Sequence, residues 1–185
     1  MALRFLKQNE YPHTIPLFKE CFGDDPEFLK EYYGQEDGGS APPLAPQGRV
    51  YRNRIAAEVD DVSGEIRCMV HVQPMNAVYP QGKEPVSYLL CVATLPSCRG
   101  QGCMDRVMRM VMEQLRREGE AWCFLVAVDK EIYRYLGFEL EWTFRPEEGE
   151  LLAADEGLTQ CSAAWLQQKD ASWHPPQSLE LRAAD

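Results

Sequence analysis

The segment Arg99-Gly-Gln-Gly-Cys103 combines an arginine, two glycines and the start of a helical pattern, a combination that can bind an anion. Glycines at 100 and 102 let backbone N–H groups approach a ligand closely. The first turn of the following helix leaves its N–H groups unpaired, beside the positive end of the helix dipole. A phosphate or pyrophosphate suits such a turn best. The alternative is a plain tight connection between a strand and a helix.

The seven cysteines indicate no second reaction centre. Cys68, Cys91 and Cys123 lie in apolar runs, where cysteine behaves as a small hydrophobic residue. Cys98 and Cys103 flank the predicted helix start, which can lower a thiol pKa, but no His or Asp accompanies them in a nucleophile motif. The three histidines are scattered, so the sequence predicts no metal site.

A strand on each side of one helix must position this turn. Residues 88–95 are almost all apolar or small, which predicts a strand buried on both faces. Apolar residues recur at helical spacing over 104–118, and cations and a glycine end that helix. Residues 121–128 predict a second strand, and 131–136 a short helix. Parallel strands joined in this way place an anion site at their carboxyl ends.

The same stretch resembles the core of the GNAT N-acetyltransferase family. The family signature Arg/Gln-x-x-Gly-x-Gly/Ala reads Arg99-Gly-Gln-Gly-Cys-Met104 here, with Met104 in place of the last Gly/Ala. A second family feature, a tyrosine three residues ahead of a Leu-Gly-Phe ending, is met at Tyr133. With this methionine and the preceding Val-Ala-Thr-Leu-Pro, the segment resembles the branch of the family related to the enhanced-intracellular-survival acetyltransferases. The resemblance is close over about half the chain and loose over its first half.

The resemblance implies an α/β fold, a central mixed β-sheet flanked by helices, in a single domain over residues 1–185. It implies a cofactor-binding core at about 85–145. The implied activity is transfer of the acetyl group of acetyl-CoA to a primary amine of a small molecule or peptide. The expected cofactor-binding residues are Val92, Ala93, Thr94, Arg99, Gly100, Gln101, Gly102, Cys103, Met104 and Asp129.

Tyr133 matches the family tyrosine that protonates the departing thiolate, so it is the expected catalytic residue. The alternative is a structural or cofactor-contacting tyrosine. Phe28, Tyr32 and Tyr33 are candidates to line the acceptor groove, with core packing as the alternative. The resemblance also leaves open a second function, a CoA-binding or interaction module without chemistry.

The general base and the acceptor stay open. Some family members carry a glutamate on the central strand, and Tyr88 occupies that position here. The candidates to accept the proton of the amine are water, Asp129 and Glu84. A homodimer is also left open.

The charge and the hydrophobic pattern of the chain limit the classes of partner that we expect. A formal net charge of −10 argues against nucleic acid and is compatible with a cationic amine, although solubility alone explains it too. No apolar run is long enough to span a membrane, and the first residues lack a signal-peptide core. We therefore expect a cytoplasmic protein without a membrane partner.

The rest of the chain predicts further elements around this core. Pro16 is expected to end or kink a helix over 10–22. Asp24-Asp25-Pro26 is typical of a helix start, and 35–48 of a loop that is a candidate lid. The remaining expectations are strands over 2–6, 49–59, 65–78, 139–144 and 178–182, and helices over 28–33 and 158–168.

Overall fold

The computed structural model describes residues 1–23, 26, 29, 53–144, 159–166 and 180–184. The described strands form a sheet in the order β1-β2-β3-β4-β5-β7-β6, and β8 pairs with β3. The β4–β5 pair is parallel, whereas β1–β2, β2–β3, β5–β7 and β6–β7 are antiparallel. The predicted mixed sheet with flanking helices is therefore confirmed.

The chain divides into two compact units. Unit 1 comprises Met1–Gln73 and Cys91–Val111, and unit 2 comprises Pro74–Leu90 and Met112–Asp185. Strands β3 (Ile66–Tyr79) and β4 (Gly82–Thr94) and helix α3 (Cys103–Arg117) contribute residues to both units. A single domain over residues 1–185 stays a prediction.

The strands of unit 1 begin with an antiparallel arrangement. Strands β1 (Ala2–Phe5) and β2 (Arg54–Val59) precede β3, as the sequence predicts. The turn between β2 and β3 is closed by Asp60, whose Oδ1 accepts the backbone N–H groups of residues 62 and 63 at 2.9 and 3.0 Å. Residues 55–59 are all buried, and one of them is the charged Glu58.

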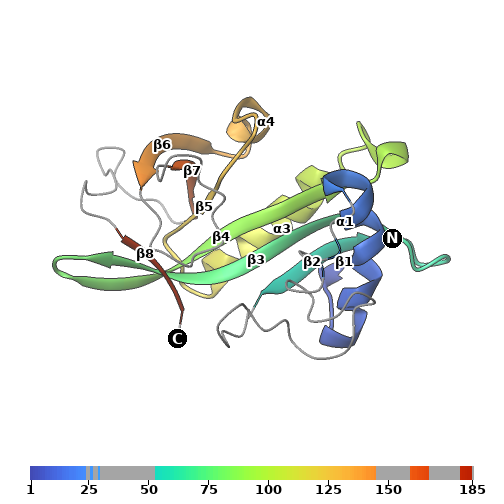
Figure 1. Cartoon of the computed structure of the whole chain (residues 1–185), viewed down its shortest axis with the longest axis horizontal. Coiled ribbons are helices and arrows are strands. Elements are labelled where there is room, and N and C mark those ends of the chain that lie inside the picture. Colours follow the sequence, from blue (N-terminus) through green and yellow to red (C-terminus); the bar gives the residue numbers. More distant parts are fainter. Residues whose placement is uncertain (24–25, 27–28, 30–52, 145–158, 167–179, 185) are drawn as a thin grey trace. The chain divides into compact units, whose positions relative to one another are not determined.

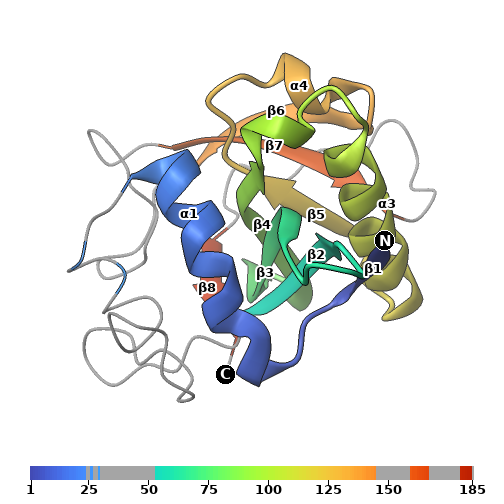
Figure 2. The same ribbon diagram turned by 90° about the vertical axis from the view of Figure 1, so that its right-hand side faces the viewer.

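The predicted helix over residues 10–22 is two helices. Gln8–Thr14 forms a 3₁₀ helix and α1 occupies Ile15–Phe22. Pro16 lies in the first turn of α1, where its missing N–H would have no partner within the helix in any case. Proline therefore starts the second helix rather than ending a long one. Figure 2 shows α1 and α3 on opposite sides of the strands.

Strands β3 and β4 are the longest and lie side by side (Figure 1). The prediction that residues 88–95 are buried on both faces is wrong, because Leu89 and Ala93 are buried while their neighbours are only half-buried. That alternation belongs to a strand with one well-covered face. Cys91 has a φ of +49°, in the left-handed region, and so interrupts the pleat of β4.

Unit 2 continues the sheet from β4. Strand β5 (Trp122–Leu125) is followed by α4 (Glu131–Arg134) and β6 (Phe138–Phe144). The strand predicted over 121–128 ends early, and the side chains of Val126 and Val128 are exposed. The predicted strand over 139–144 is confirmed.

The predicted helix over residues 158–168 is wrong. Thr159–Trp165 forms β7, which pairs with β5 on one side and β6 on the other. Cys161, Ser162, Ala163 and Ala164 are all buried, as expected for a strand inside a sheet. Ala163 and Ala164 favour a helix locally, but the strand conformation satisfies the ladders of both neighbours and overrides that preference. The predicted last strand is confirmed as β8 (Glu180–Ala183).

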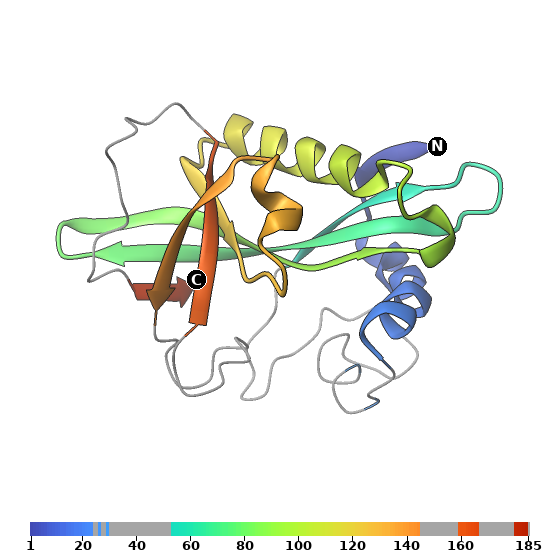
Figure 3. The ribbon, with the colours of Figure 1, turned by 90° about the horizontal axis from the view of Figure 1, so that it is seen from above.

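Helix α3 follows the predicted apolar pattern. Val107, Met108, Val111 and Leu115 are fully buried, so the methionine-containing face packs in the core. Figure 3 shows α3 lying along β3 and β4. This packing fixes the direction in which the N-terminus of α3 points.

Several predictions fall outside the described residues. They concern the helix over 28–33 with the acceptor-groove candidates Phe28, Tyr32 and Tyr33, and the loop over 35–48. Within the described ranges, no helix combines the length and apolar character that crossing a bilayer requires. In the same ranges, no group of three or more His, Cys, Asp or Glu side chains is placed to hold a metal ion.

Candidate active site

The predicted anion-binding turn forms a tight connection from β4 into α3. A single 3₁₀ turn (Pro96–Cys98) follows the strand, and α3 begins at Cys103. Gly100 and Gly102 have φ angles of +73° and +72°, which L residues with a side chain rarely adopt. Residues 99–102 are exposed, so their backbone is open to a ligand.

The turn fits a pyrophosphate group. Helix α3 has 15 residues, and an α-helix leaves the N–H groups of its first turn without partners inside the helix. A Cβ built at Gly100 would have no atom within 4 Å, so the space beside this backbone is open. Dipole, free donors and open space together favour an anion at the start of α3.

Gln101 lies between the two glycines, and its side chain folds back onto the protein. Its Nε2 donates to the carbonyl of Ser97 at 2.9 Å, and its Oε1 accepts from Nη2 of Arg67 at 2.7 Å. Its backbone carbonyl accepts from Nη1 of Arg106 at 2.9 Å. The side chain of Gln101 thus holds the turn in shape, and with its carbonyl bound to Arg106 only the backbone N–H of this residue is left to meet a ligand.

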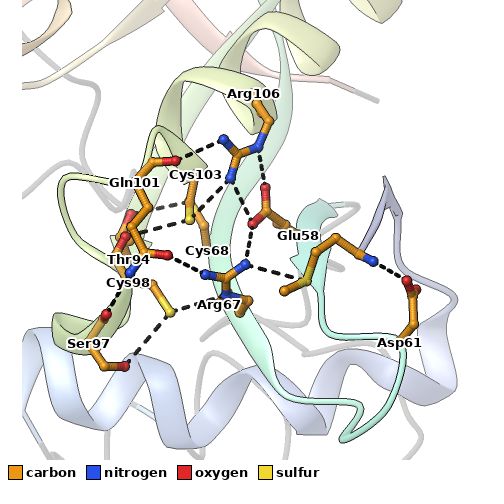
Figure 4. A network of polar contacts seen from close by, with 11 residues as sticks. Glu58, Asp61, Arg67, Cys68, Thr94, Ser97, Cys98, Gln101, Cys103 and Arg106 are labelled. Atoms are coloured by element: carbon orange, nitrogen blue, oxygen red, sulfur yellow. Dashed lines mark hydrogen bonds and ion pairs between the residues drawn. The ribbon is translucent and has the colours of Figure 1, made fainter.

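Both arginines converge on the buried carboxylate of Glu58 (Figure 4). Arg106 binds it with two donors, Nε to Oε2 at 2.7 Å and Nη2 to Oε1 at 3.0 Å, and Arg67 Nη1 reaches Oε1 at 3.1 Å. The Glu58 side chain is 2% exposed. The hydrogen bonds from Arg106 hold the pKa of Glu58 below its ordinary value, although burial opposes them.

The two cysteines beside the turn are buried rather than exposed. Cys98 Sγ accepts from Arg67 Nε at 3.2 Å, and Cys103 Sγ lies 3.6 Å from the Cys98 carbonyl. Burial raises the pKa of the Cys103 thiol, and this effect exceeds the lowering by the nearby guanidinium groups. The helix start therefore does not activate Cys103, in agreement with the absence of a nucleophile motif.

The end of β4 leads directly into this turn. Residues Val92, Ala93 and Thr94 lie beyond Leu89, where the register with β5 ends at the pair Leu89–Leu125. On the other side β4 stays paired with β3, and Leu95 N–H donates to the Arg67 carbonyl at 2.9 Å. The last residues of β4 thus lie beyond the section that pairs with β5. Arg99 Nε donates to the Thr94 carbonyl at 3.3 Å.

Tyr133 and Asp129 belong to unit 2. Tyr133 lies on α4, half-buried, with its ring edge-on to Phe138 at 6.0 Å between centroids. Tyr135 is 56% exposed. Asp129 Oδ1 accepts the backbone N–H of Glu131, the first residue of α4, at 3.0 Å. The expected roles of Tyr133 in catalysis and of Asp129 in cofactor binding stay predictions.

The remaining candidate for the base, Glu84, also lies in unit 2, as does Tyr88, which occupies the position of the family glutamate. Glu84 Oε1 accepts from the hydroxyl of Tyr79 and from Nε1 of Trp122, the latter at 2.7 Å. Tyr88 stacks on Phe124 with centroids 5.0 Å apart. Glu84 is thus held by two buried or half-buried aromatic side chains, which is the arrangement of a structural carboxylate.

Sequence reasoning missed Glu58, Arg67 and Arg106. One signal was available, because Glu58 is an acid within the apolar strand segment Ile55-Ala-Ala-Glu-Val59, and a buried acid demands a cationic partner. The partners themselves follow only from the fold, since Arg67 comes from β3 and Arg106 from the first turns of α3.

The family follows from a comparison with known families. A family described as "Acetyltransferase (GNAT) domain" matches residues 2–140, more than half of the chain. The chain belongs to the GNAT acetyltransferase family. Membership supports an acyltransferase, and the family predicted from the two motifs is confirmed. A search of curated proteins gave no significant match.

Solved structures agree on the fold. A probable N-acyltransferase from Enterococcus faecalis is 16% identical, with a TM-score of 0.59, over 80% of this chain and 35% of that one. Eis1 from Mycobacterium abscessus is 19% identical, with a TM-score of 0.55, over 80% of this chain and 35% of Eis1. A GNAT acetyltransferase from Brucella melitensis, solved in complex with acetyl-CoA, is 19% identical, with a TM-score of 0.50, over 75% of this chain and 82% of that one. The chain spans about a third of the length of the first two proteins.

Proposed function

We propose that the chain is an N-acetyltransferase that transfers the acetyl group of acetyl-CoA to a primary amine of a small molecule or peptide. The supporting observation is the exposed turn at 99–102, whose two left-handed glycines lead into the N-terminus of α3. The backbone N–H groups from Gly100 to Met104 would bind the cofactor pyrophosphate. The Brucella relative, which was solved with acetyl-CoA, adds support through its family.

The last residues of β4 would bind the pantetheine arm. In this proposal the amide groups of the arm pair with the backbone of Val92 and Ala93 as an added strand. The end of the β5 pairing at Leu89 supports this, since a backbone that already pairs on both sides has no donors to spare. The Thr94 carbonyl already accepts from Arg99, so Thr94 would contribute its N–H or side chain.

Acetyl-CoA supplies an activated acetyl thioester. A neutral amine attacks the thioester carbonyl carbon directly, a C–N bond forms and the C–S bond breaks. The Tyr133 hydroxyl would donate its proton to the departing sulfur, and solvent would restore that proton. The amine loses its own proton to solvent or to a base. A backbone N–H of β4 would polarise the thioester carbonyl.

Cofactor binding tests the proposal first. Calorimetry with acetyl-CoA, desulfo-CoA and ATP should give micromolar binding of the two CoA ligands and weaker binding of ATP. Gly102→Glu should abolish binding, because it places a negative charge at the turn and a side chain at a φ of +72°. A folded wild-type chain that binds no CoA derivative would refute the enzyme. Binding without turnover on an amine panel would favour a CoA-binding module without chemistry.

Tyr133→Phe tests the general acid. The variant should lose about 10²-fold in turnover, because the thiolate departs without a proton donor, while its affinity for acetyl-CoA should stay near that of the wild type. Tyr135→Phe is the matched control, since Tyr135 is a neighbouring and more exposed tyrosine. Equal turnover in Tyr133→Phe and Tyr135→Phe would remove Tyr133 from the mechanism and leave the cofactor site standing.

A further inference from the structure

A single buried carboxylate holds the shape of the anion-binding turn. Glu58, Arg67, Arg106 and Gln101, which together form the Glu58 network, join β2, β3, α3 and the turn (Figure 4). Glu58 takes three hydrogen bonds from the two guanidinium groups. Those groups then bind Gln101 at two points, its backbone carbonyl and its side-chain oxygen, at 2.9 and 2.7 Å.

The direction of the Gln101 carbonyl fixes the direction of the next N–H. A peptide unit is planar and trans, so the carbonyl of Gln101 and the N–H of Gly102 point in opposite directions. The carbonyl points to Nη1 of Arg106. The Gly102 N–H therefore points away from Arg106 and from the interior that contains Glu58. Because a glycine follows Gln101, this peptide unit would be free to flip if Arg106 did not hold its carbonyl.

Arg106 is itself held in place. Its side chain is 46% exposed, and an exposed arginine is free to adopt many rotamers unless it is bound at its end. The two-point contact with Glu58, whose own side chain is 2% exposed, removes this freedom. Glu58 thus holds the side chain of Arg106, and Arg106 in turn holds the peptide unit between Gln101 and Gly102.

We propose that Glu58 is a positioning residue for the pyrophosphate of CoA. Through Arg106 and Arg67 it holds Gln101 so that the Gly102 N–H is presented to the ligand before the ligand binds. This inference rests on the proposed function, because it names the group that the turn receives. Positioning of this kind raises affinity by reducing the ordering that binding must otherwise impose.

The experiment compares two ligands, one with and one without the 3′-phospho-ADP part that contains the pyrophosphate. Calorimetry measures the Kd of CoA, which carries it, and of pantetheine, which lacks it. Glu58→Gln keeps the shape of the side chain and removes its charge. Arg106→Gln acts on a half-exposed side chain and serves as a second variant that does not depend on a buried substitution. Glu113→Gln is the control, since Glu113 pairs with Arg116 and Arg117 further along α3.

The expected result is selective. In Glu58→Gln and in Arg106→Gln the Kd of CoA should rise about tenfold, while the Kd of pantetheine should change by less than about twofold. The control should match the wild type for both ligands. If Glu58→Gln does not fold, the same criterion applies to Arg106→Gln.

Three outcomes would overturn the inference or its basis. An unchanged Kd of CoA in a folded variant would show that the turn needs no such support. Equal loss for CoA and pantetheine would mean that Glu58 contributes to general stability only. A wild-type chain that binds no CoA would instead refute the proposed function itself, before any variant is compared.

Discussion

Gly100 and Gly102 have nearly the same backbone conformation but different surroundings. Their φ angles are +73° and +72°, so an alanine at either position adopts a left-handed conformation that costs about 1 kcal/mol. A Cβ at Gly100 would meet no atom within 4 Å, whereas a Cβ at Gly102 would lie 3.2 Å from Nη1 of Arg106. An arginine end normally moves aside easily, but this one is bound to Glu58 and to the Gln101 carbonyl.

We therefore predict that Gly102→Ala lowers the free energy of unfolding more than Gly100→Ala does. Both variants should lose about 1 kcal/mol from the backbone, and Gly102→Ala should lose more because its methyl group displaces Arg106. Urea unfolding under reducing conditions measures both. The excess should vanish when the two glycine variants are compared in an Arg106→Gln background. An excess that persists there would mean that Arg106 is not its cause.

The sequence predicts the anion-binding turn itself but not the side chains that hold it in shape. Gly100, Gly102 and the helical pattern after them are local features, and local physics makes them an anion site. Gln101 looked like part of the cofactor contact because it lies between two such glycines, yet its side chain turns to Ser97 and Arg67. The partners of Glu58 are distant in the sequence, so no local pattern could reveal them.

Strand β7 shows what local preference leaves undecided at the scale of elements. Its central residues Cys-Ser-Ala-Ala include two alanines, which favour a helix, and the alternation is hidden because both faces are buried. Its position between β5 and β6 decides its conformation. Helix α3, by contrast, was predicted nearly to the residue, since its apolar face repeats along the whole helix.

Strand β7 lies beyond residues 2–140, the part of the chain that matches the family. We predict that a chain ending at Phe144 fails to fold in unit 2, because β5 and β6 would lose their common neighbour. A chain ending at Leu166 is the control, since it keeps β7 and loses β8. Thermal unfolding followed by near-UV circular dichroism should show a cooperative transition for the chain ending at Leu166, at a lower Tm than for the full chain. The chain ending at Phe144 should show none. A cooperative transition in both would contradict the role given to β7.

Four titratable groups in the described part of the chain favour the fold at neutral pH. Complete burial lowers the pKa of His71 to about 3, and hydrogen bonds lower the pKa of Glu58 and, to about 2, the pKa values of Glu10 and Glu113. For His71 the unfolded chain takes up a proton near pH ~6.5, while the folded chain takes it up only near its lowered pKa. Below about pH 6.5 the unfolded chain therefore binds more protons, and stability falls as the pH falls.

We predict that the free energy of unfolding decreases from about pH 7 to about pH 5, before the carboxylates contribute. One histidine accounts for a slope approaching about 1.4 kcal/mol per pH unit well below its unfolded pKa. His71→Gln should flatten the curve between about pH 6.5 and 5 and leave the decline below about pH 4.5, where the carboxylates of the unfolded chain take up protons and their folded counterparts stay ionised. Urea midpoints across this range measure the effect. A wild-type curve that is flat over the upper part of this range would show that His71 is not held neutral.

Cys91 has a backbone conformation that favours glycine. A left-handed residue with a side chain stores about 1 kcal/mol of strain, and the packing of β4 must supply that energy in every folded molecule. A glycine there would relieve this strain, at a cost in chain entropy of about 0.5–1 kcal/mol. A half-buried thiol in its place means that the chain tolerates a small, permanent tension in β4 where its pairing with β5 has just ended.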